Sequence, residues 1–243
     1  MNELITVVVP VYNEAGLLAR NMALLEGYLK TLSASYELIL VNDGSSDASG
    51  KICHELAADS PCIRAIVNDI NRGKGHAVKE GILAGEGTYR IFLDADLAVP
   101  AAFISPCLKR LRNGTDIVIG SRHLPRSSLK IREGPLRQFM GSIYRNMVRR
   151  ALGLKVSDVT CGLKGFRAHA AVRIFSRSMI DRWGYDAELI FLAQQLDHDI
   201  AEIPVKWFHS FDSKVLIGLD AIRSFLEMLQ ILRFHRQGRY RIP

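Results

Sequence analysis

The hydrophobic and polar positions in the first half of the chain alternate between two patterns. Short apolar runs, typical of strands buried on both faces, occupy residues 4–12, 36–43, 62–68, 89–96 and 116–122. Between them, residues 14–32, 45–59, 75–85 and 101–114 carry apolar side chains at helical spacing. Strands that alternate with helices predict crossover units, so we expect an α/β fold: a mostly parallel, Rossmann-like sheet flanked by helices.

The second half is less regular. Its patterns predict helices over 135–153 and 185–197, a loop with a short strand over 157–171, and a strand over 199–209. A final helix from Leu216 repeats apolar residues, and its tail is basic (Ile222, Phe225, Leu226, Leu229 and Leu232; Arg233, Arg236, Arg239 and Arg241). We therefore expect a main domain over 1–215 and an amphipathic helix with a basic tail over 216–243. The apolar stripe could pack on the domain or lie in a membrane interface with its arginines on anionic lipid.

Polar residues gather where the predicted strands end. The clusters are Tyr12, Asn13 and Glu14; Asn42 and Asp43; Arg72 and Lys74; Asp94 and Asp96; and Ser121 and Arg122. Turn chemistry explains any one of them. In open α/β sheets, however, ligands bind beyond the carboxyl ends of the strands. Five such clusters on one edge therefore indicate a ligand site.

Composition places the chain among ordinary globular proteins, with 48% hydrophobic and 23% charged residues. No window holds 18 uninterrupted apolar residues, so we expect no transmembrane helix. The first residues, "MNELITVVVPVYNE", lack the basic start of a signal peptide. The four cysteines show no C-x-x-C spacing, which favours reduced cytoplasmic thiols over a zinc site.

The net charge of +7 is concentrated in one segment. Between residues 122 and 150, eight basic residues face a single acid, Glu133 (Arg122, Arg126, Lys130, Arg132, Arg137, Arg145, Arg149 and Arg150). A solvated face normally mixes both signs, so this excess predicts an anionic partner: nucleic acid, an acidic membrane surface or a phosphate-bearing substrate. Nucleic acid is the least favoured, because only Phe139 and Tyr144 could stack on bases there.

Asp94 and Asp96 stand one residue apart at the end of the apolar run 89–93. Where a strand ends, the chain can turn so that both carboxylates reach one ion. Two carboxylates beside an open position suit Mg²⁺ or Mn²⁺, with a diphosphate completing the coordination shell. The alternative is an aspartate that caps the next helix.

Two further motifs are weaker when taken singly. "VNDGSSD" at 41–47 fits either a turn with a helix cap or a site where Asp43 contacts a base or ribose. "NRGKGHA" at 71–77 is glycine-rich and basic and leads into a helix, so Lys74 could meet a phosphate. It has neither P-loop nor dinucleotide-binding spacing.

The order of these motifs is specific. "VPVYNE", "VNDGSSD", "NRGKGHAV" and "DADLAVP" in succession resemble the GT-A nucleotide-sugar transferases of glycosyltransferase family 2. "GSR" at 120–122, "DVTCGLKGF" at 158–166, "RWGYDAEL" at 182–189 and "SKV" at 213–215 resemble its polyprenyl-phosphate branch, which contains dolichyl-phosphate mannose synthases and β-glucosyltransferases. The resemblance runs from about Ile5 to Val215 and implies a GT-A fold with an acceptor-side subregion in its second half.

The resemblance also implies roles for individual residues. The nucleotide sugar would be held by Pro10, Tyr12, Glu14, Asn42, Asp43, Lys74 and Asp94, and the metal by Asp94 and Asp96. Asp96, Arg122, Arg137 and Lys214 would act in catalysis, the three basic residues on phosphate groups. Asp158, Trp183, Asp186 and Glu188 would shape the sugar and acceptor pocket.

Two departures from the family pattern bear on the substrate. Asn42 replaces the first aspartate of the usual "VDDGS", which leaves the base of the donor open. Ala98 stands where mannose synthases carry a metal-binding glutamine. Ala98, together with the "CGLK" and "WGYDAEL" patterns, favours glucose over mannose.

The resemblance thus implies a metal-dependent enzyme. It would move a hexose from a UDP- or GDP-sugar to a polyprenyl or dolichyl phosphate at the cytoplasmic face of a membrane, inverting the anomeric carbon. Because the acceptor phosphate is already anionic, no strong general base is required. The alternatives are a family member that extends a glycan or glycolipid, and a non-catalytic nucleotide-binding protein at a membrane surface.

Overall fold

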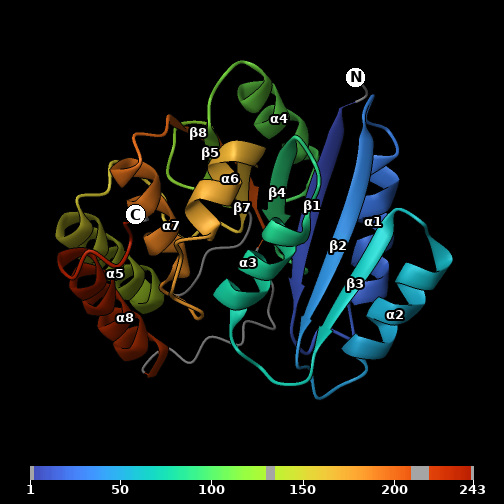
Figure 1. Ribbon diagram of the computed structural model, residues 1–243, viewed down its shortest axis with the longest axis horizontal. Helices are drawn as coiled ribbons and strands as arrows, with labels where there is room; N and C mark the ends of the chain where they lie inside the picture. Colours follow the sequence, from blue (N-terminus) through green and yellow to red (C-terminus); the bar gives the residue numbers. More distant parts are fainter. Residues whose placement is uncertain (1–2, 130–134, 209–218, 242–243) are drawn as a thin grey trace.

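The computed structural model describes residues 3–129, 135–208 and 219–241. Its centre is a seven-stranded sheet in the order β3-β2-β1-β4-β7-β5-β8 (Figure 1). The strands are β1 (Leu4–Val11), β2 (Ser35–Asp43), β3 (Ile63–Asn68), β4 (Tyr89–Leu93), β5 (Ile117–Ser121), β7 (Leu163–Arg167) and β8 (Ile200–Pro204). All neighbouring pairs are parallel except those of β7, which is antiparallel to β4 and β5. The expected mostly parallel sheet is confirmed.

Helices cover both faces of the sheet. One face carries α1 (Leu18–Leu29), α2 (Ser49–Asp59) and α4 (Ile104–Arg112), which follows the 3₁₀ turn η1 (Ala101–Phe103). The other carries α3 (Lys74–Ala84), α6 (Ala168–Phe175) and α7 (Tyr185–Gln195), with α5 (Pro135–Leu152) and α8 (Leu219–Arg236) beyond them (Figure 1). Successive residues of β1 point to opposite faces, so Val7 and Val9 join the core under α1, and Val8 joins the core under α3.

Two expectations from the sequence are corrected by the structure. The segment 157–171, expected to be loop and strand, ends in α6, whose buried residues Ala170, Ala171, Ile174 and Phe175 fix it by packing. The strand expected over 199–209 is split into β8 and β9 (Lys206–Trp207), and β9 pairs with β6 (Ser128–Leu129) in a separate ribbon. Pro204, which has no N–H to donate, ends β8.

The final helix α8 packs on α5 and α7 with a face that takes in Leu232 of the predicted stripe but not Phe225, Leu226 or Leu229. Its buried residues are Ser224, Met228, Ile231 and Phe234. The expected stripe residues Phe225, Leu226 and Leu229 are instead 39%, 56% and 45% exposed. The structure does not describe the side chain of Ile222. The expected domain boundary at 215/216 also lies outside the described residues and stays a prediction.

Candidate active site

The carboxyl ends of β1, β2, β4 and β5 lie on one edge of the sheet, the lower edge in Figure 1 for β1 and β2. Asp94 and Asp96 follow β4, and Arg122 follows β5. The loop before β7 reaches the same edge because β7 runs in the opposite direction, so residues 158–162 join these side chains. A Cβ on Gly162 would lie only 2.1 Å from Asp94 Oδ2, so the loop touches Asp94, and a larger residue there would displace the carboxylate.

Five acidic and basic side chains form a network at this edge: Lys74, Asp94, Asp96, Lys164 and Asp186. Lys74 Nζ lies 2.6 Å from Asp94 Oδ1, and Lys164 Nζ pairs with Asp186 and donates to the Cys161 carbonyl at 2.9 Å. Burial opposes the charge on Lys74, but the carboxylates of Asp94 and Asp186 outweigh it and raise its pKa. The network holds three carboxyl groups, on Asp94, Asp96 and Asp186, and two ammonium groups, on Lys74 and Lys164. Acidic groups therefore outnumber the basic ones.

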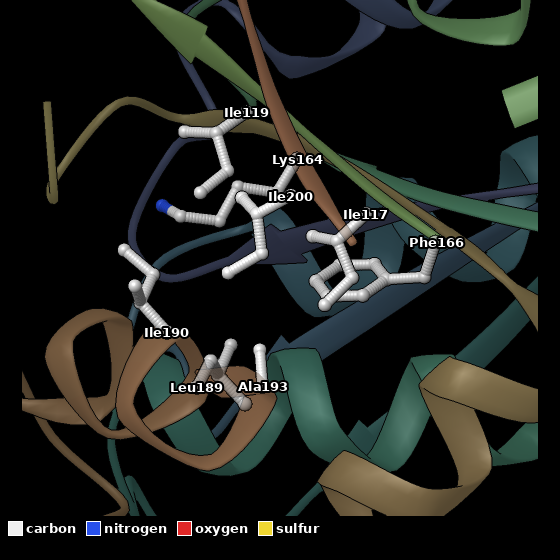
Figure 2. A pocket seen from close by; sticks show the side chains of 8 residues that line it. All are labelled: Ile117, Ile119, Lys164, Phe166, Leu189, Ile190, Ala193 and Ile200. Carbon is white, nitrogen blue, oxygen red and sulfur yellow. The ribbon is translucent and has the colours of Figure 1, made fainter. Parts of the chain in front are cut away.

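Lys164 was not assigned a role from the sequence. It is fully buried in β7, and its ammonium lies 5.3 Å from the centre of the Phe92 ring. Figure 2 shows its side chain between Ile119 and Ile190, in a narrow space whose other lining residues are apolar. That space is core rather than substrate site. Because a buried ammonium needs a counter-charge, Lys164 and Asp186 hold each other in place. The pKa of Asp186 is raised, mainly because of burial.

The Asp94–Asp96 pair fits a divalent cation. Asp96 has a raised pKa, chiefly because of burial and then because of repulsion from Asp94. Asp96 Oδ1 accepts a hydrogen bond from Ala98 N at 2.9 Å, which fixes the carboxylate at the strand end. A cation between the two carboxylates would offset the repulsion, and hard oxygen donors suit Mg²⁺ or Mn²⁺. Ala98 is a buried residue that offers no side-chain ligand.

Asp43 organises the loop that carries Lys74. Its carboxylate accepts hydrogen bonds from Arg72 N at 3.0 Å and Gly73 N at 2.8 Å. Gly73 has a φ of +119°, and a Cβ there would lie 2.4 Å from the Asp181 carbonyl oxygen, so the turn into α3 requires glycine. The expected contact of Asp43 with a nucleoside stays a prediction, but its two hydrogen bonds fix the backbone directly before Lys74.

The ends of β1 and β2 are tied together beside Asp43. Asn13, in the left-handed region at φ +54°, accepts from Ser46 N at 2.8 Å and donates its own N–H to Ser45 Oγ at 2.9 Å. Glu14 N donates to Ser49 Oγ at 2.7 Å. These bonds hold the predicted nucleotide residues at one edge: Pro10, Tyr12, Glu14 and Asn42. Tyr12 is half-exposed and Asn42 is buried, with its side-chain Oδ1 unpaired among the described residues.

Arg122 is held by a carboxylate. Its Nε and Nη2 each donate to Asp158 at 2.8 Å, and Nη2 also reaches Thr160 Oγ1 at 2.9 Å. Burial alone would raise the pKa of Asp158, but the hydrogen bonds of Arg122 outweigh it and lower that pKa to about 2. Glu202, a residue without an assigned role in the sequence, accepts from Ser157 N and Asp158 N and so anchors the loop.

The remaining predicted pocket residues lie around α7. Glu188 is fully buried and accepts from Met179 N at 2.9 Å, Ile180 N at 3.0 Å and the Tyr240 hydroxyl at 2.7 Å, which indicates a structural role. Trp183, just before the helix, is partly exposed. The side chain of Arg137 and the whole of Lys214 lie outside the described part of the chain. Their assignments, like the other site roles, stay predictions.

Comparison with known proteins decides the family. The model of "Glycosyl transferase family 2" matches residues 6–175, more than half of the chain. The chain belongs to glycosyl transferase family 2. The matched region contains Asp43, Lys74, the Asp94–Asp96 pair and the Arg122–Asp158 pair. The expected family and its glycosyltransferase activity are confirmed.

Several relatives of this family 2 chain carry the name dolichyl-phosphate beta-glucosyltransferase. A dolichyl-phosphate beta-glucosyltransferase of Dictyostelium discoideum is 35% identical over 93% of this chain and 72% of its own length. Proteins of the same name from Trichomonas vaginalis and Homo sapiens are 32% and 33% identical, over 96% and 98% of this chain and 72% and 78% of theirs. The expected resemblance to the polyprenyl-phosphate branch is confirmed.

A solved structure shares the fold of the family 2 chain. Glucosyl-3-phosphoglycerate synthase from Mycobacterium tuberculosis, in complex with Mn²⁺, UDP and glucosyl-3-phosphoglycerate, superimposes with a TM-score of 0.68 at 18% identity, over 94% of this chain and 80% of that one. At this identity the likeness confirms the fold alone.

No helix among residues 3–129, 135–208 and 219–241 is both long and apolar enough to span a bilayer.

Proposed function

We propose that this glycosyltransferase moves glucose from a nucleoside diphosphate sugar to a polyprenyl phosphate and inverts the anomeric carbon. The observation that carries the proposal is the charge network at the carboxyl edge of the sheet, with Lys74 on Asp94 and Asp96 beside it. The relatives named dolichyl-phosphate beta-glucosyltransferase support glucose and the lipid phosphate.

The donor would lie over the network. Asp94 and Asp96 would hold Mg²⁺ or Mn²⁺, which as a Lewis acid would stabilise the departing diphosphate. Lys74 lies between the two carboxylate groups Asp94 and Asp186, where its ammonium can meet a diphosphate oxygen once the donor binds. Asp43 holds the backbone of the loop so that Lys74 stays at this position.

The acceptor phosphate would lie over a cluster of arginines. Arg145 Nη1 donates to Nε2 of His123, the residue that follows Arg122 in the sequence, at 2.8 Å. Arg149 Nε is buried without a hydrogen-bond partner among the described residues. Burial, and repulsion from Arg122 and Arg149, lower the pKa of Arg145. An anion would offset this repulsion. β5 lies two strands from β4, about 10 Å, so a hexose could bridge the two anionic groups.

The reaction then needs orientation more than proton transfer. A phosphate monoester is an anionic nucleophile, so the residues that matter hold two negatively charged reactants in line. Guanidinium groups suit this task because their planar forks match phosphate oxygens.

A donor panel tests the proposed function. The protein is incubated with Mn²⁺, a polyprenyl phosphate and UDP- or GDP-linked glucose or mannose, and sugar in the lipid phase is measured. We expect a β-linked glucosyl lipid from one glucose donor and, because the nucleophile is the phosphate, no product from the unphosphorylated polyprenol. If donors bind but none yields a lipid product, the transfer to lipid is refuted and a nucleotide-binding role remains.

We also propose that α8 contacts the membrane that holds the acceptor. Phe225, Leu226 and Leu229 form an exposed apolar face, and exposed Arg233 and Arg236 continue the same face one to two turns further on. The helix is tied to the site because Glu227 accepts from Gly184 N at 2.6 Å, directly before α7. The combination of apolar and cationic side chains suits an anionic lipid surface.

Vesicle flotation tests this contact. The double variant Leu226→Glu/Leu229→Glu should lower partitioning onto anionic vesicles by about 100-fold, because the exposed halves of the two leucines together contribute about 3 kcal/mol when they enter the bilayer. Leu24→Glu, at an exposed leucine of α1, is the matched control and should bind normally. Activity on detergent-dispersed acceptor should persist in all three proteins. Undiminished flotation of the double variant would refute the contact without touching the proposed reaction.

A further inference from the structure

Three side chains of types that can ligate a metal meet at the edge of the sheet opposite to the candidate active site. Asp116 directly precedes β5, His169 lies in the first turn of α6, and His198 comes two residues before β8. Since β5 runs from Asp116 towards Arg122, its five residues separate this cluster from the Arg122 edge by about 16 Å. The cluster is therefore distinct from the Asp94–Asp96 pair.

The donor atoms are close enough to share one ion. Asp116 Oδ1 lies 3.0 Å from His169 Nε2, and Asp116 Oδ2 lies 3.1 Å from His198 Nδ1. One ligand atom from each of the three residues lies within 4.8 Å of the others, and the two imidazole centroids are 5.7 Å apart. Ligands about 2.0–2.2 Å from a tetrahedral zinc ion are separated by roughly 3.3 Å, so only the two histidines need to approach slightly.

The backbone around the cluster is well fixed. Asp199 N donates to Asp116 Oδ2 at 3.2 Å, and Ile117 N donates to the Asp199 carbonyl at 3.0 Å. The Asp116 carbonyl accepts from Arg167 N at 2.9 Å, at the end of β7. The ligand positions are therefore set by strand pairing rather than by mobile loops, which is the outer-shell support that metal sites use.

Burial differs across the cluster in a way that suits a bound ion. The His198 side chain is 4% exposed, so its Nδ1, the ring nitrogen that lies 3.1 Å from Asp116 Oδ2, is shielded from bulk water. The His169 side chain is 54% exposed, so an ion can enter from solvent and keep water as a fourth ligand.

We propose that Asp116, His169 and His198 form a second metal site, with three protein ligands, that takes Zn²⁺ or a similar borderline ion. Two imidazoles and one carboxylate favour zinc over Mg²⁺ and Mn²⁺, which prefer all-oxygen shells. The ion would join the amino ends of β5 and β8 to α6. It would stabilise the folded protein, because the three ligands converge only in the native state.

Zinc titration of the purified full chain tests the site. With excess Mg²⁺ present to saturate the Asp94–Asp96 pair, we expect about one Zn²⁺ per chain and a rise in Tm of about 5 °C or more at 100 times Kd. Co²⁺ bound in its place should show the intense visible absorption of a four-coordinate ion. His169→Ala, at an exposed position, should abolish the stoichiometric binding and the Tm rise while leaving the metal-free Tm nearly unchanged.

His54→Ala, at an exposed histidine of α2, is the matched control and should bind zinc as the unchanged protein does. Two results would overturn the proposal. No stoichiometric Zn²⁺ binding would mean that Asp116 merely accepts hydrogen bonds from the two imidazoles. Zinc binding that survives His169→Ala but is lost in Asp96→Asn would place the ion at the active site instead.

Discussion

Asp96→Asn should lower the rate of glycosyl transfer by about 10²–10³-fold, the loss expected when one group that stabilises transition-state charge is removed. The amide keeps an oxygen that can accept from Ala98 N, so the substitution removes the charge and leaves the turn intact. Because burial and repulsion from Asp94 raise the pKa of Asp96, the folded protein loses little by the change. We therefore expect kcat to fall at an unchanged or higher Tm.

The matched control for this variant is Asp59→Ala, which removes an exposed carboxylate at the end of α2 and should retain full activity. Activity is measured as sugar transferred to the polyprenyl phosphate over a range of Mn²⁺ concentrations. Asp96→Asn should also need more Mn²⁺ for its residual activity. Near-normal rates in this variant would show that the Asp94–Asp96 pair does not hold the catalytic metal.

Lys164→Met should be the most destabilising single change at the site. It leaves the Asp186 carboxylate buried without its main partner, and breaking a buried pair in this way costs about 3–5 kcal/mol. For a chain of this size we expect a fall in Tm of roughly 10 °C by thermal unfolding. Activity should fall as well, because Asp186 would draw Lys74 away from Asp94.

A double-mutant cycle separates the effect of the Lys164–Asp186 ion pair on stability from the effect of lost packing. Lys164→Met/Asp186→Leu replaces both charges by apolar groups and should be more stable than Lys164→Met alone. The single variant should also lose stability as pH rises. The pKa of Asp186 is raised in the folded state, so that state binds more protons above the unfolded pKa, and stability falls towards neutral pH. A double variant less stable than the single one would refute the buried pair as the cause.

Much of the fold was predictable from local patterns. Continuous apolar runs identified β1, β2 and β4, because both faces of such strands are buried. Apolar residues at helical spacing identified α1, α3 and α7. α6 was missed, since an eight-residue helix is stabilised by tertiary packing of residues such as Ile174 and Phe175 rather than by propensity. The direction of β7 depends on where the chain enters the sheet, which no local pattern encodes.

The sequence predicted at which edge of the sheet the site lies, but not which charged side chains pair there. Asp94, Asp96 and Lys74 were identified as polar residues after strands, and they do lie together. In the sequence, Lys164 resembles an ordinary lysine of a strand. Only the structure shows its contact with Asp186, 22 residues later. Arg122 was expected to meet a phosphate, yet its guanidinium also needs Asp158, 36 residues further along, to stay in place.

The sequence by itself determined the family, the mostly parallel sheet and the edge at which ligands bind, because strand burial and the turns after strands are local properties of the chain. Only the tertiary structure decided which charges compensate one another and which face of α8 is left exposed. Both depend on contacts between distant segments: Lys164 against Asp186, and Met228 and Ile231 against the core. Three residues of the stripe that the sequence offered either for packing or for a membrane interface are left exposed by the fold: Phe225, Leu226 and Leu229.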